Sequence, residues 1–375
     1  MQVPSALLVW APVFAGSLHS VRDACACWDE GRAEGCRVSE DAAPSCSMLG
    51  WPGVSSASVL VTWAPNWAHG ASAVPVQGWH DLHKHWLSGA FSDLVDAYRA
   101  SVLQSLENST HFVGFRRDDA YESVVETVPV SEGYMHLDNL RQSSPWLLSL
   151  ARAAKLIDLI GSPRTHDFGP PVGTLSPTTL RYVRILGEIL GEFGELACHL
   201  QNASWRVLEV GGGFGGLRLA WHLVSPSTEY VILDLPEVML LIHKVLAHFP
   251  EASARTEFAG PEVFADKQLF DLCISTFAYS EFQSEYQQQI MSSVFPRCRR
   301  GLIIDNAFSQ GPAPLVGRRL LHALGQMAVV RAESTVWRGC AVRKVFWRAR
   351  AANWTSAVKQ ACEAAPAPAL ASLSK

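Results

Sequence analysis

The stretch from Arg206 to Pro236 constrains the fold of this chain most, because it predicts a strand, a glycine turn, a helix and a second strand in succession. Five glycines follow the first strand, and Asp234 ends the second. Glycine lets the backbone turn sharply and approach a ligand closely, and a carboxylate at a strand end can accept hydrogen bonds from a ribose diol. The stretch therefore predicts a nucleoside-binding half-site.

Two glycine patterns overlap in the turn. Gly211, Gly213 and Gly216 fit the GxGxxG pattern typical of dinucleotide binding. The acidic-x-G-x-G-x-G pattern of S-adenosylmethionine (SAM) enzymes uses the first two of these glycines together with Glu209 and Gly215. A carboxylate ahead of the turn would repel a pyrophosphate, but it suits a cofactor that has no phosphate and carries a methionine ammonium group. Glu209 therefore favours SAM, with a tight turn that binds no ligand as the alternative.

Composition indicates a globular protein with a large core. The chain has 375 residues, of which 48% are hydrophobic and 18% charged, which allows two or three domains. The formal net charge is −4 and no long run has a single sign, so nothing indicates a nucleic acid partner. No segment has the ~20 continuous apolar residues of a membrane span. The sequence does not indicate an oligomeric state.

We interpret residues 1–77 as a leader or a poorly ordered, cysteine-containing extension. Its first twenty residues resemble a signal peptide, although no basic residue precedes Arg22 and Pro12 interrupts the apolar run. A cytoplasmic location is favoured, and a secretory lumen remains the alternative. In a lumen, four cysteines could form a small disulfide subdomain: Cys25, Cys27, Cys36 and Cys46. Cys273, within an expected strand, is interpreted as a buried thiol.

Residues 78–175 are expected to form a mostly helical cap or substrate region. Apolar residues recur at helical spacing from Trp79 to Leu106, and a helix is expected over 145–160, with 124–130 a strand or extended segment. The histidines at the start, His80, His83 and His85, are better explained as solvated side chains than as metal ligands. We predict no metal site.

A SAM-binding domain is expected over 176–350, beginning at a helix that Ser176 caps and Pro177 starts. Strands and helices then alternate, which predicts an α/β Rossmann-like parallel sheet. Two closing runs, 334–337 and 342–347, would add an antiparallel hairpin, which is typical of SAM-dependent methyltransferases. The tail over 351–375 is expected to be disordered.

Four motifs carry a family resemblance: LSPTTLRY (175–182), VLEVGGGFGG (207–216), YVILDLPEV (230–238) and DLCISTFAYSEF (271–282). In this order and spacing they resemble a family of sugar O-methyltransferases, from about Ile157 to Asn306. The resemblance implies a class I Rossmann-like fold, SAM as cofactor, and methyl transfer to a hydroxyl of a carbohydrate or glycoconjugate. A nicotinamide-dependent oxidoreductase and a catalytically silent binding protein remain alternatives.

Candidate site residues follow from this reaction, in which a positioned base must accept the proton of a weakly nucleophilic hydroxyl. We predict Glu281 or His166 as the base, with Asp167 to orient it or replace it. Arg181, Tyr182 and Tyr279 are candidates for substrate binding. The cofactor is expected to contact six residues: Glu209, Gly211, Gly213, Gly215, Asp234 and Leu235.

Overall fold

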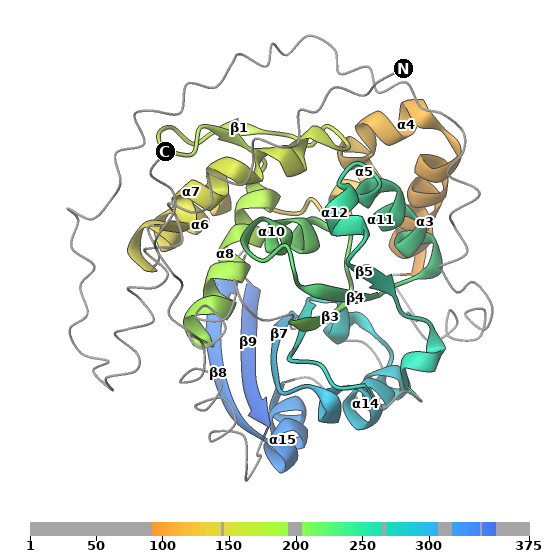
Figure 1. The fold of residues 1–375 in the computed structure, drawn as a ribbon, viewed down its shortest axis with the longest axis vertical. Helices are drawn as coiled ribbons and strands as arrows, with labels where there is room; N and C mark the ends of the chain where they lie inside the picture. Colours follow the sequence, from red (N-terminus) through yellow and green to blue (C-terminus); the bar gives the residue numbers. More distant parts are fainter. Residues whose placement is uncertain are drawn as a thin grey trace, which may run out of the picture.

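A seven-stranded sheet forms the centre of the computed structural model, which describes residues 92–143, 146–193, 205–264, 268–306, 317–337 and 340–349 (Figure 1). The strand order is β5-β4-β3-β6-β7-β9-β8. The strands span β3 (Arg206–Val210), β4 (Glu229–Leu233), β5 (Thr256–Phe258), β6 (Leu272–Thr276), β7 (Arg300–Asn306), β8 (Ala328–Trp337) and β9 (Cys340–Ala349).

The first five strands pair in parallel, and β9 lies antiparallel between β7 and β8. The predicted Rossmann-like sheet with a closing antiparallel hairpin is confirmed. The hairpin is longer than expected, because β8 begins at Ala328, directly after the helix α15 (Gly317–Met327). From β3 the chain runs outward through β4 and β5, then returns to β6 on the other side of β3. This reversal creates the crevice in which such sheets bind ligands.

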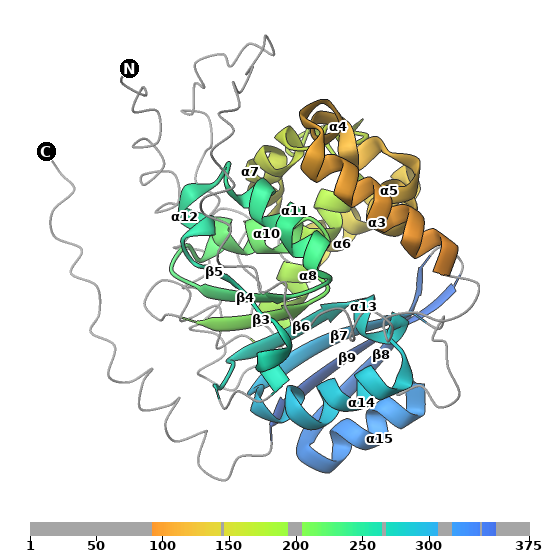
Figure 2. The ribbon, with the colours of Figure 1, turned by 90° about the vertical axis from the view of Figure 1, so that its right-hand side faces the viewer.

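Helices cover both faces of the sheet, which explains why its strands are nearly continuous apolar runs. Figure 2 shows α10 and α11 on one face and α14 and α15 on the other. In β4, the side chains from Tyr230 to Leu233 are at most 4% exposed. The helices between the strands span α10 (Gly216–Val224), α11 (Pro236–Leu246), α12 (Pro250–Ser253), η7 (Pro261–Phe264), α13 (Ala278–Glu281), α14 (Ser284–Ser293) and η8 (Phe295–Arg297).

The region before the sheet is mainly helical, as predicted for a cap. Its elements are α3 (Ser92–Glu107), α4 (Ser109–Gly114), η5 (Phe115–Arg117), α5 (Asp119–Val124), α6 (Val130–Ser143), α7 (Trp146–Ala153), η6 (Ala154–Leu159), the short strands β1 (His166–Asp167) and β2 (Thr174–Leu175), and α8 (Pro177–Glu192). The Ser176 hydroxyl accepts from the Thr178 N–H, so the predicted helix start is confirmed. Residues 124–130 form no strand, because Val124 ends α5 and Val130 begins α6.

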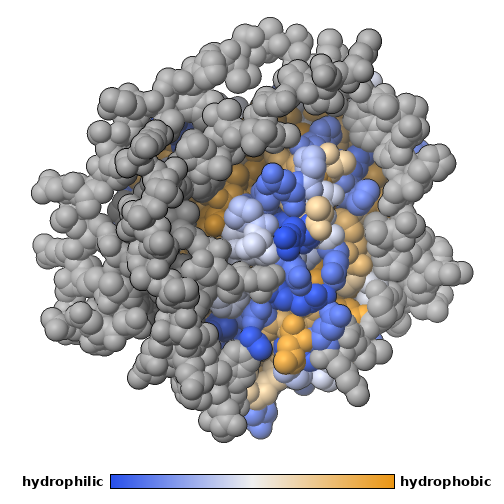
Figure 3. Space-filling view, in the orientation of Figure 1, coloured by the Kyte–Doolittle hydropathy of each residue, from blue (hydrophilic) through white to orange (hydrophobic). Residues whose placement is uncertain are grey.

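Several expectations fall on residues outside the described ranges: the N-terminal segment 1–77, the start of the first cap helix with its three histidines, and the C-terminal tail. None of the described helices is both long and apolar enough to cross a membrane. On the face seen in Figure 3, hydrophilic and hydrophobic side chains of the described residues are interspersed.

Cys273 is not a free thiol, and its interpretation as one is wrong. It forms a disulfide with Cys298, with the two Cα atoms 5.7 Å apart. Cys273 lies in β6, and Cys298 precedes β7, the parallel neighbour of β6. The pairing depends on the order of strands in the sheet, which brings together two cysteines that are 25 residues apart in the chain.

Candidate cofactor and transfer site

The glycine turn at the end of β3 takes a path that only glycine adopts easily. Gly211, Gly213 and Gly215 have φ angles of 87°, 60° and 86°, a region that side chains with a Cβ disfavour. The Gly211 N–H donates to the Leu233 carbonyl at 2.9 Å, which ties the turn to the end of β4. A Cβ added at Gly211 would overlap the Cβ of Ala278, the first residue of α13. The turn therefore packs directly against the segment that follows β6.

Asp234 follows β4 and joins the same turn through its carboxylate. Its Oδ2 accepts the N–H groups of Gly212 at 2.6 Å and Gly213 at 3.2 Å, and its Oδ1 accepts the Leu235 N–H at 2.7 Å. Burial raises the pKa of Asp234 to about 7, although the backbone donors act in the opposite direction. These three N–H groups use three of the roughly four lone-pair positions of the carboxylate, so one position on Oδ1 remains to accept from a ribose hydroxyl. Asp234 therefore lies at the strand end where a carboxylate that binds ribose is expected.

Glu209 occupies a different environment from the one its motif suggests. Its side chain is 1% exposed, and the Tyr230 hydroxyl donates to Oε2 at 2.9 Å. Burial raises the pKa of Glu209 to about 8, and the nearby Arg218 partly counteracts this. Glu209 is therefore mostly protonated at pH 7, and a neutral acid attracts an ammonium group weakly. A cofactor contact for Glu209 remains a prediction.

Helix α3 of the cap carries Tyr98, a buried residue whose surroundings include the charge of Asp234. Tyr98 is 5% exposed, and its pKa is raised well above the usual value by burial, then by the charge of Asp234, with smaller effects of Tyr182, Glu237 and Glu281. In the sequence Tyr98 is one member of the apolar face of an amphipathic helix. Its place near Asp234 depends on how α3 packs on α11, which periodicity does not indicate.

Tyr182 and Arg181 both lie on α8 but have different surroundings. The Tyr182 ring packs on Phe214 with centroids 5.8 Å apart, and a Cβ added at Gly216 would overlap this ring. Burial raises the pKa of Tyr182 to about 12. Arg181 donates to the Val125 carbonyl at 2.9 Å and the Thr127 hydroxyl at 3.3 Å, and so holds the segment between α5 and α6. Tyr182 borders the turn, whereas Arg181 fixes the cap.

Of the candidate bases, Glu281 lies near the site. Glu281 is exposed at the end of α13, and its charge is one of the smaller causes that raise the pKa of Tyr98. Phe277, the residue before α13, has φ +73° and ψ −40°. This backbone geometry is strained for a bulky residue, and such strain often occurs beside functional sites. The Phe277 N–H donates to the Ile304 carbonyl at 2.8 Å, so the strained turn is anchored to the end of β7.

His166 and Asp167 lie in the small β1–β2 sheet instead. Nε2 of His166 is 3.0 Å from the Tyr134 hydroxyl of α6, and Oδ1 of Asp167 accepts the Gly169 N–H at 3.0 Å. Among the described residues, the polar and ring contacts of both side chains stay within this hairpin and α6. No described contact joins them to the glycine turn, and the catalytic roles of His166, Asp167 and Glu281 remain predictions.

Tyr279 points into the core rather than toward a ligand. Its side chain is fully buried, its hydroxyl donates to the Gln287 carbonyl at 3.2 Å, and its N–H donates to the Ser275 hydroxyl at 3.0 Å. Burial, and then the charge of Asp305, raises its pKa. Tyr279 therefore holds α13 onto the sheet and lies outside the site proposed below.

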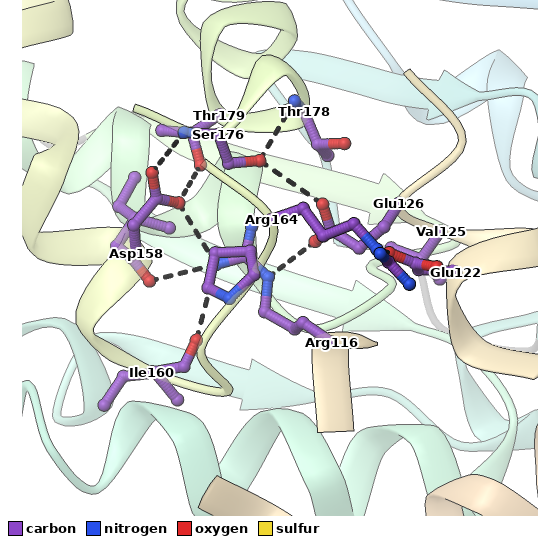
Figure 4. A network of polar contacts seen from close by, with 12 residues as sticks. Arg116, Glu122, Val125, Glu126, Asp158, Ile160, Arg164, Ser176, Thr178 and Thr179 are labelled. Atoms are coloured by element: carbon purple, nitrogen blue, oxygen red, sulfur yellow. Dashed lines mark hydrogen bonds and ion pairs between the residues drawn. The ribbon is translucent and has the colours of Figure 1, made fainter. Parts of the chain in front are cut away.

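A buried ion network lies where η6 meets the start of α8 (Figure 4). Nε of Arg116 donates to Glu126 at 2.5 Å, and Nη1 donates to Asp158 at 3.2 Å. Asp158 also accepts the Ser176 N–H and the Thr179 hydroxyl, both at 2.6 Å. Asp158 therefore forms an ordered connection between η6 and the start of α8.

The described residues contain no group of three or more His, Cys, Asp or Glu side chains placed to hold a metal ion. The groups that do converge, the glycine turn and the accepting Asp234 carboxylate, suit a nucleoside with a ribose diol.

No model of a known protein family matches this sequence, and no curated protein sequence is similar to it. Solved structures with a similar arrangement include magnesium protoporphyrin IX methyltransferase ChlM from Synechocystis PCC 6803 with bound SAH (12% identity, 46% of this chain and 82% of that one, TM-score 0.35). Another is mitomycin 7-O-methyltransferase MmcR (20% identity, TM-score 0.31), of which the match covers 56%, against 45% of this chain. A third is TrmK of M. capricolum (11% identity, 42% and 68%, TM-score 0.31). These likenesses cover less than half of the chain and bear on neither its substrate nor its site residues.

Proposed function

We propose that this protein is a SAM-dependent O-methyltransferase whose acceptor is a hydroxyl of a carbohydrate or glycoconjugate. The observation that carries the proposal is the contact of Asp234 with the N–H groups of Gly212 and Gly213, at the reversal point of the sheet. The closing antiparallel strand β9 supports the same reaction class. The sugar acceptor rests on the motif resemblance alone.

The same contact argues against a nicotinamide-dependent oxidoreductase. A dinucleotide would place its pyrophosphate on the N–H groups of the glycine turn. Here two of those donors are already bound by a carboxylate, which would also repel phosphate oxygens. A ribose diol, in contrast, donates hydrogen bonds and gains from this carboxylate.

In the proposed reaction, bound SAM supplies a methyl group that its sulfonium makes electrophilic. The turn from Gly211 to Gly216 allows close approach of the cofactor, and Asp234 accepts from one of its ribose hydroxyls. Glu281 takes the proton as the acceptor oxygen forms its bond to the methyl carbon, while the carbon–sulfur bond breaks and leaves a neutral thioether. The cap, held by Arg181, excludes water. Most of the rate enhancement is expected from positioning.

Ligand-induced thermal stabilisation tests the cofactor class. SAM and its product S-adenosylhomocysteine (SAH), at ~100 times their dissociation constants, should each add about 2.7 kcal/mol to the free energy of unfolding. NAD serves as the competing ligand, and stabilisation by NAD alone would refute the proposal.

A labelled-methyl screen against sugars and glycans then tests the acceptor. Glu281→Gln should keep SAM affinity and slow turnover about 100-fold or more. Normal turnover of this variant would remove Glu281 as the base. Cofactor binding without transfer to any acceptor would favour the catalytically silent binding protein.

A further inference from the structure

Strand β8 forms one edge of the central sheet (Figure 1). Among the described residues it pairs with β9 alone, in an unbroken register of ten residue pairs. Proteins commonly protect such an edge from other chains by a short strand, a proline or a bulge. β8 has ten residues and no proline, and four of its residues are exposed: Val329, Arg331, Ala332 and Glu333. The edge is therefore able to pair with a further strand.

The pairing with β9 determines which backbone groups of β8 point outward. The Ala349 N–H of β9 donates to the Arg299 carbonyl at 2.9 Å, on the β7 side. In an antiparallel pair, a residue that faces away from its partner strand lies opposite one that does the same, and Ala349 lies opposite Ala328. The backbone groups of Ala328 therefore point away from β9. Because these groups alternate along a strand, those of Val330 and Ala332 point outward as well.

The exposed part of β8 carries two opposite charges, placed symmetrically about Ala332. Arg331 and Glu333 form an ion pair within the strand, and their side chains are 50% and 45% exposed. Arg331 also pairs with Glu192 of α8, which places both charges on the α8 face of the sheet, since residues two apart share a face. Val329 lies on that face too and is 65% exposed.

A second copy of β8 fits this edge best in one register. Residues with outward backbone groups must lie opposite one another for hydrogen bonds to form between the copies. An antiparallel pair centred on Ala332 meets this condition and puts Arg331 of each copy directly opposite Glu333 of the other. A pair centred on Arg331 or on Glu333 would put like charges directly opposite, which is destabilising.

We infer that the β8 edge is an interface at which two copies of this chain pair antiparallel about a two-fold axis at Ala332, so that the central sheet continues from one copy into the other. The two strands would overlap over residues 328–336, a length of about 30 Å. Each Ala332 would exchange two backbone hydrogen bonds with its counterpart. Each copy has one β8 edge, so the pairing closes at a dimer. The pairing does not depend on the proposed function.

Sedimentation equilibrium of the full chain tests for this dimer, and the wild type should have twice the mass of one chain. Ala332→Pro removes an N–H that points away from β9, so each chain should still fold while the dimer dissociation constant rises about 100-fold or more. Glu251→Arg is the control, because α12 precedes β5 at the opposite edge of the sheet and this side chain is 77% exposed. It should leave the dissociation constant unchanged.

An exchange of charges tests the register. Arg331→Glu would put two glutamates opposite each other and Glu333→Arg two arginines, so the dissociation constant of each variant alone should rise about tenfold. An equimolar mixture of the two variants should recover the wild-type constant, since each opposing pair is then oppositely charged. Loss of the Arg331–Glu192 pair within one chain would not be recovered by mixing.

Three results would overturn the inference. A wild type that is monomeric at roughly 100 µM would show that Arg331 and Glu333 protect the edge from pairing. A dimer that Ala332→Pro and both charge variants leave unchanged would place the interface on another surface. A mixture that dissociates as readily as the separate variants would exclude the register centred on Ala332. If Ala332→Pro fails to fold by circular dichroism, the charge variants and their mixture decide.

Discussion

The glycine turn and the Arg116 network are both buried and polar, yet they use their hydrogen-bonding groups differently. In the network, each charged group is directed at another part of the same chain, and Arg116 alone contacts two carboxylates and two carbonyls. At the turn, backbone N–H groups also donate to the Asp234 carboxylate, but they meet it beyond the carboxyl ends of the central strands β3 and β4, and one lone-pair position of the carboxylate remains for a ligand. The turn lies within the motifs that suggested the family, whereas the network meets them only at Ser176 and Thr179. A residue in a motif can therefore either stabilise the cap or bind the ligand, and its contacts distinguish the two roles.

The largest expected effect comes from breaking the network. Arg116→Met would leave the Glu126 and Asp158 carboxylates buried without their cation. Arg116 is fully buried and Glu126 and Asp158 have side chains only 6% and 8% exposed. We expect a loss of about 3–5 kcal/mol in the free energy of unfolding, measured by urea denaturation.

Arg164→Met is the matched control for that variant. Arg164 is drawn beside the network in Figure 4 and pairs with Glu122, but its side chain is 70% exposed. An exposed pair contributes little, so its midpoint should equal that of the wild type. Equal effects of the two arginines would mean that the network is not the buried anchor described here.

A substitution at the glycine turn should instead change the affinity for SAM. Asp234→Asn keeps the shape but removes the charge that accepts from the ribose, so SAM affinity should fall about 10- to 100-fold. The amide nitrogen would also face a backbone N–H that the carboxylate now accepts, so the free energy of unfolding should fall by about 1–3 kcal/mol. Because the pKa of Asp234 is about 7, wild-type affinity should decrease as pH falls from 8 to 6 and the carboxylate becomes protonated. The variant should lack this dependence. Titration calorimetry at the two pH values measures both, and a wild-type affinity that is constant with pH would contradict the assignment.

Glu209 belongs to the cofactor motif by its sequence, but its side chain is buried and bonded to Tyr230 in the core. Its folded pKa of about 8 lies above the ordinary value of 4.5 for a glutamate, so the native state binds a proton more tightly than the unfolded state. Stability is then fully present below about pH 4.5 and decreases as pH rises through 8. Between pH 6 and 8 the loss should be about 2 kcal/mol.

Glu209→Gln should reduce this slope, since an amide does not titrate, while the smaller contribution of Asp234 remains. Denaturation curves at pH 6 and 8 compare the two proteins. If Glu209→Gln leaves the slope unchanged but abolishes SAM binding, Glu209 belongs with the ligand after all.

The sequence was sufficient for the sheet because its signals are local. Glycines next to an apolar run, a serine before a proline, and alternating strands and helices act over a few residues, and the structure confirms what they predict. Contacts between distant segments could not be predicted in this way. The approach of Tyr98 to Asp234 depends on the docking of α3 on α11, and the Cys273–Cys298 disulfide depends on strand order. The hydroxyl of Tyr279 donates within the core, which the sequence did not indicate, because position after a strand does not show whether a side chain turns outward or inward; its contact with substrate stays a prediction.

The smallest effect concerns Ser176, which takes part in both a local and a distant interaction. Its hydroxyl accepts the Thr178 N–H at 3.1 Å as a helix cap and lies 3.4 Å from Oε2 of Glu126 as a weak member of the network. As a cap alone, Ser176→Ala should cost about 1 kcal/mol.

A double-mutant cycle with Arg116→Met separates these roles of Ser176. If it is only a cap, the two losses should add within about 0.5 kcal/mol, whereas a coupling above that would place it in the network. The 3.4 Å contact is long for a hydroxyl and a carboxylate, which normally lie 2.5–2.7 Å apart. We therefore expect additivity. The Ser176 hydroxyl then stabilises α8 independently of the buried charges. Its backbone N–H, which donates to Asp158, belongs to the network, whereas its hydroxyl does not.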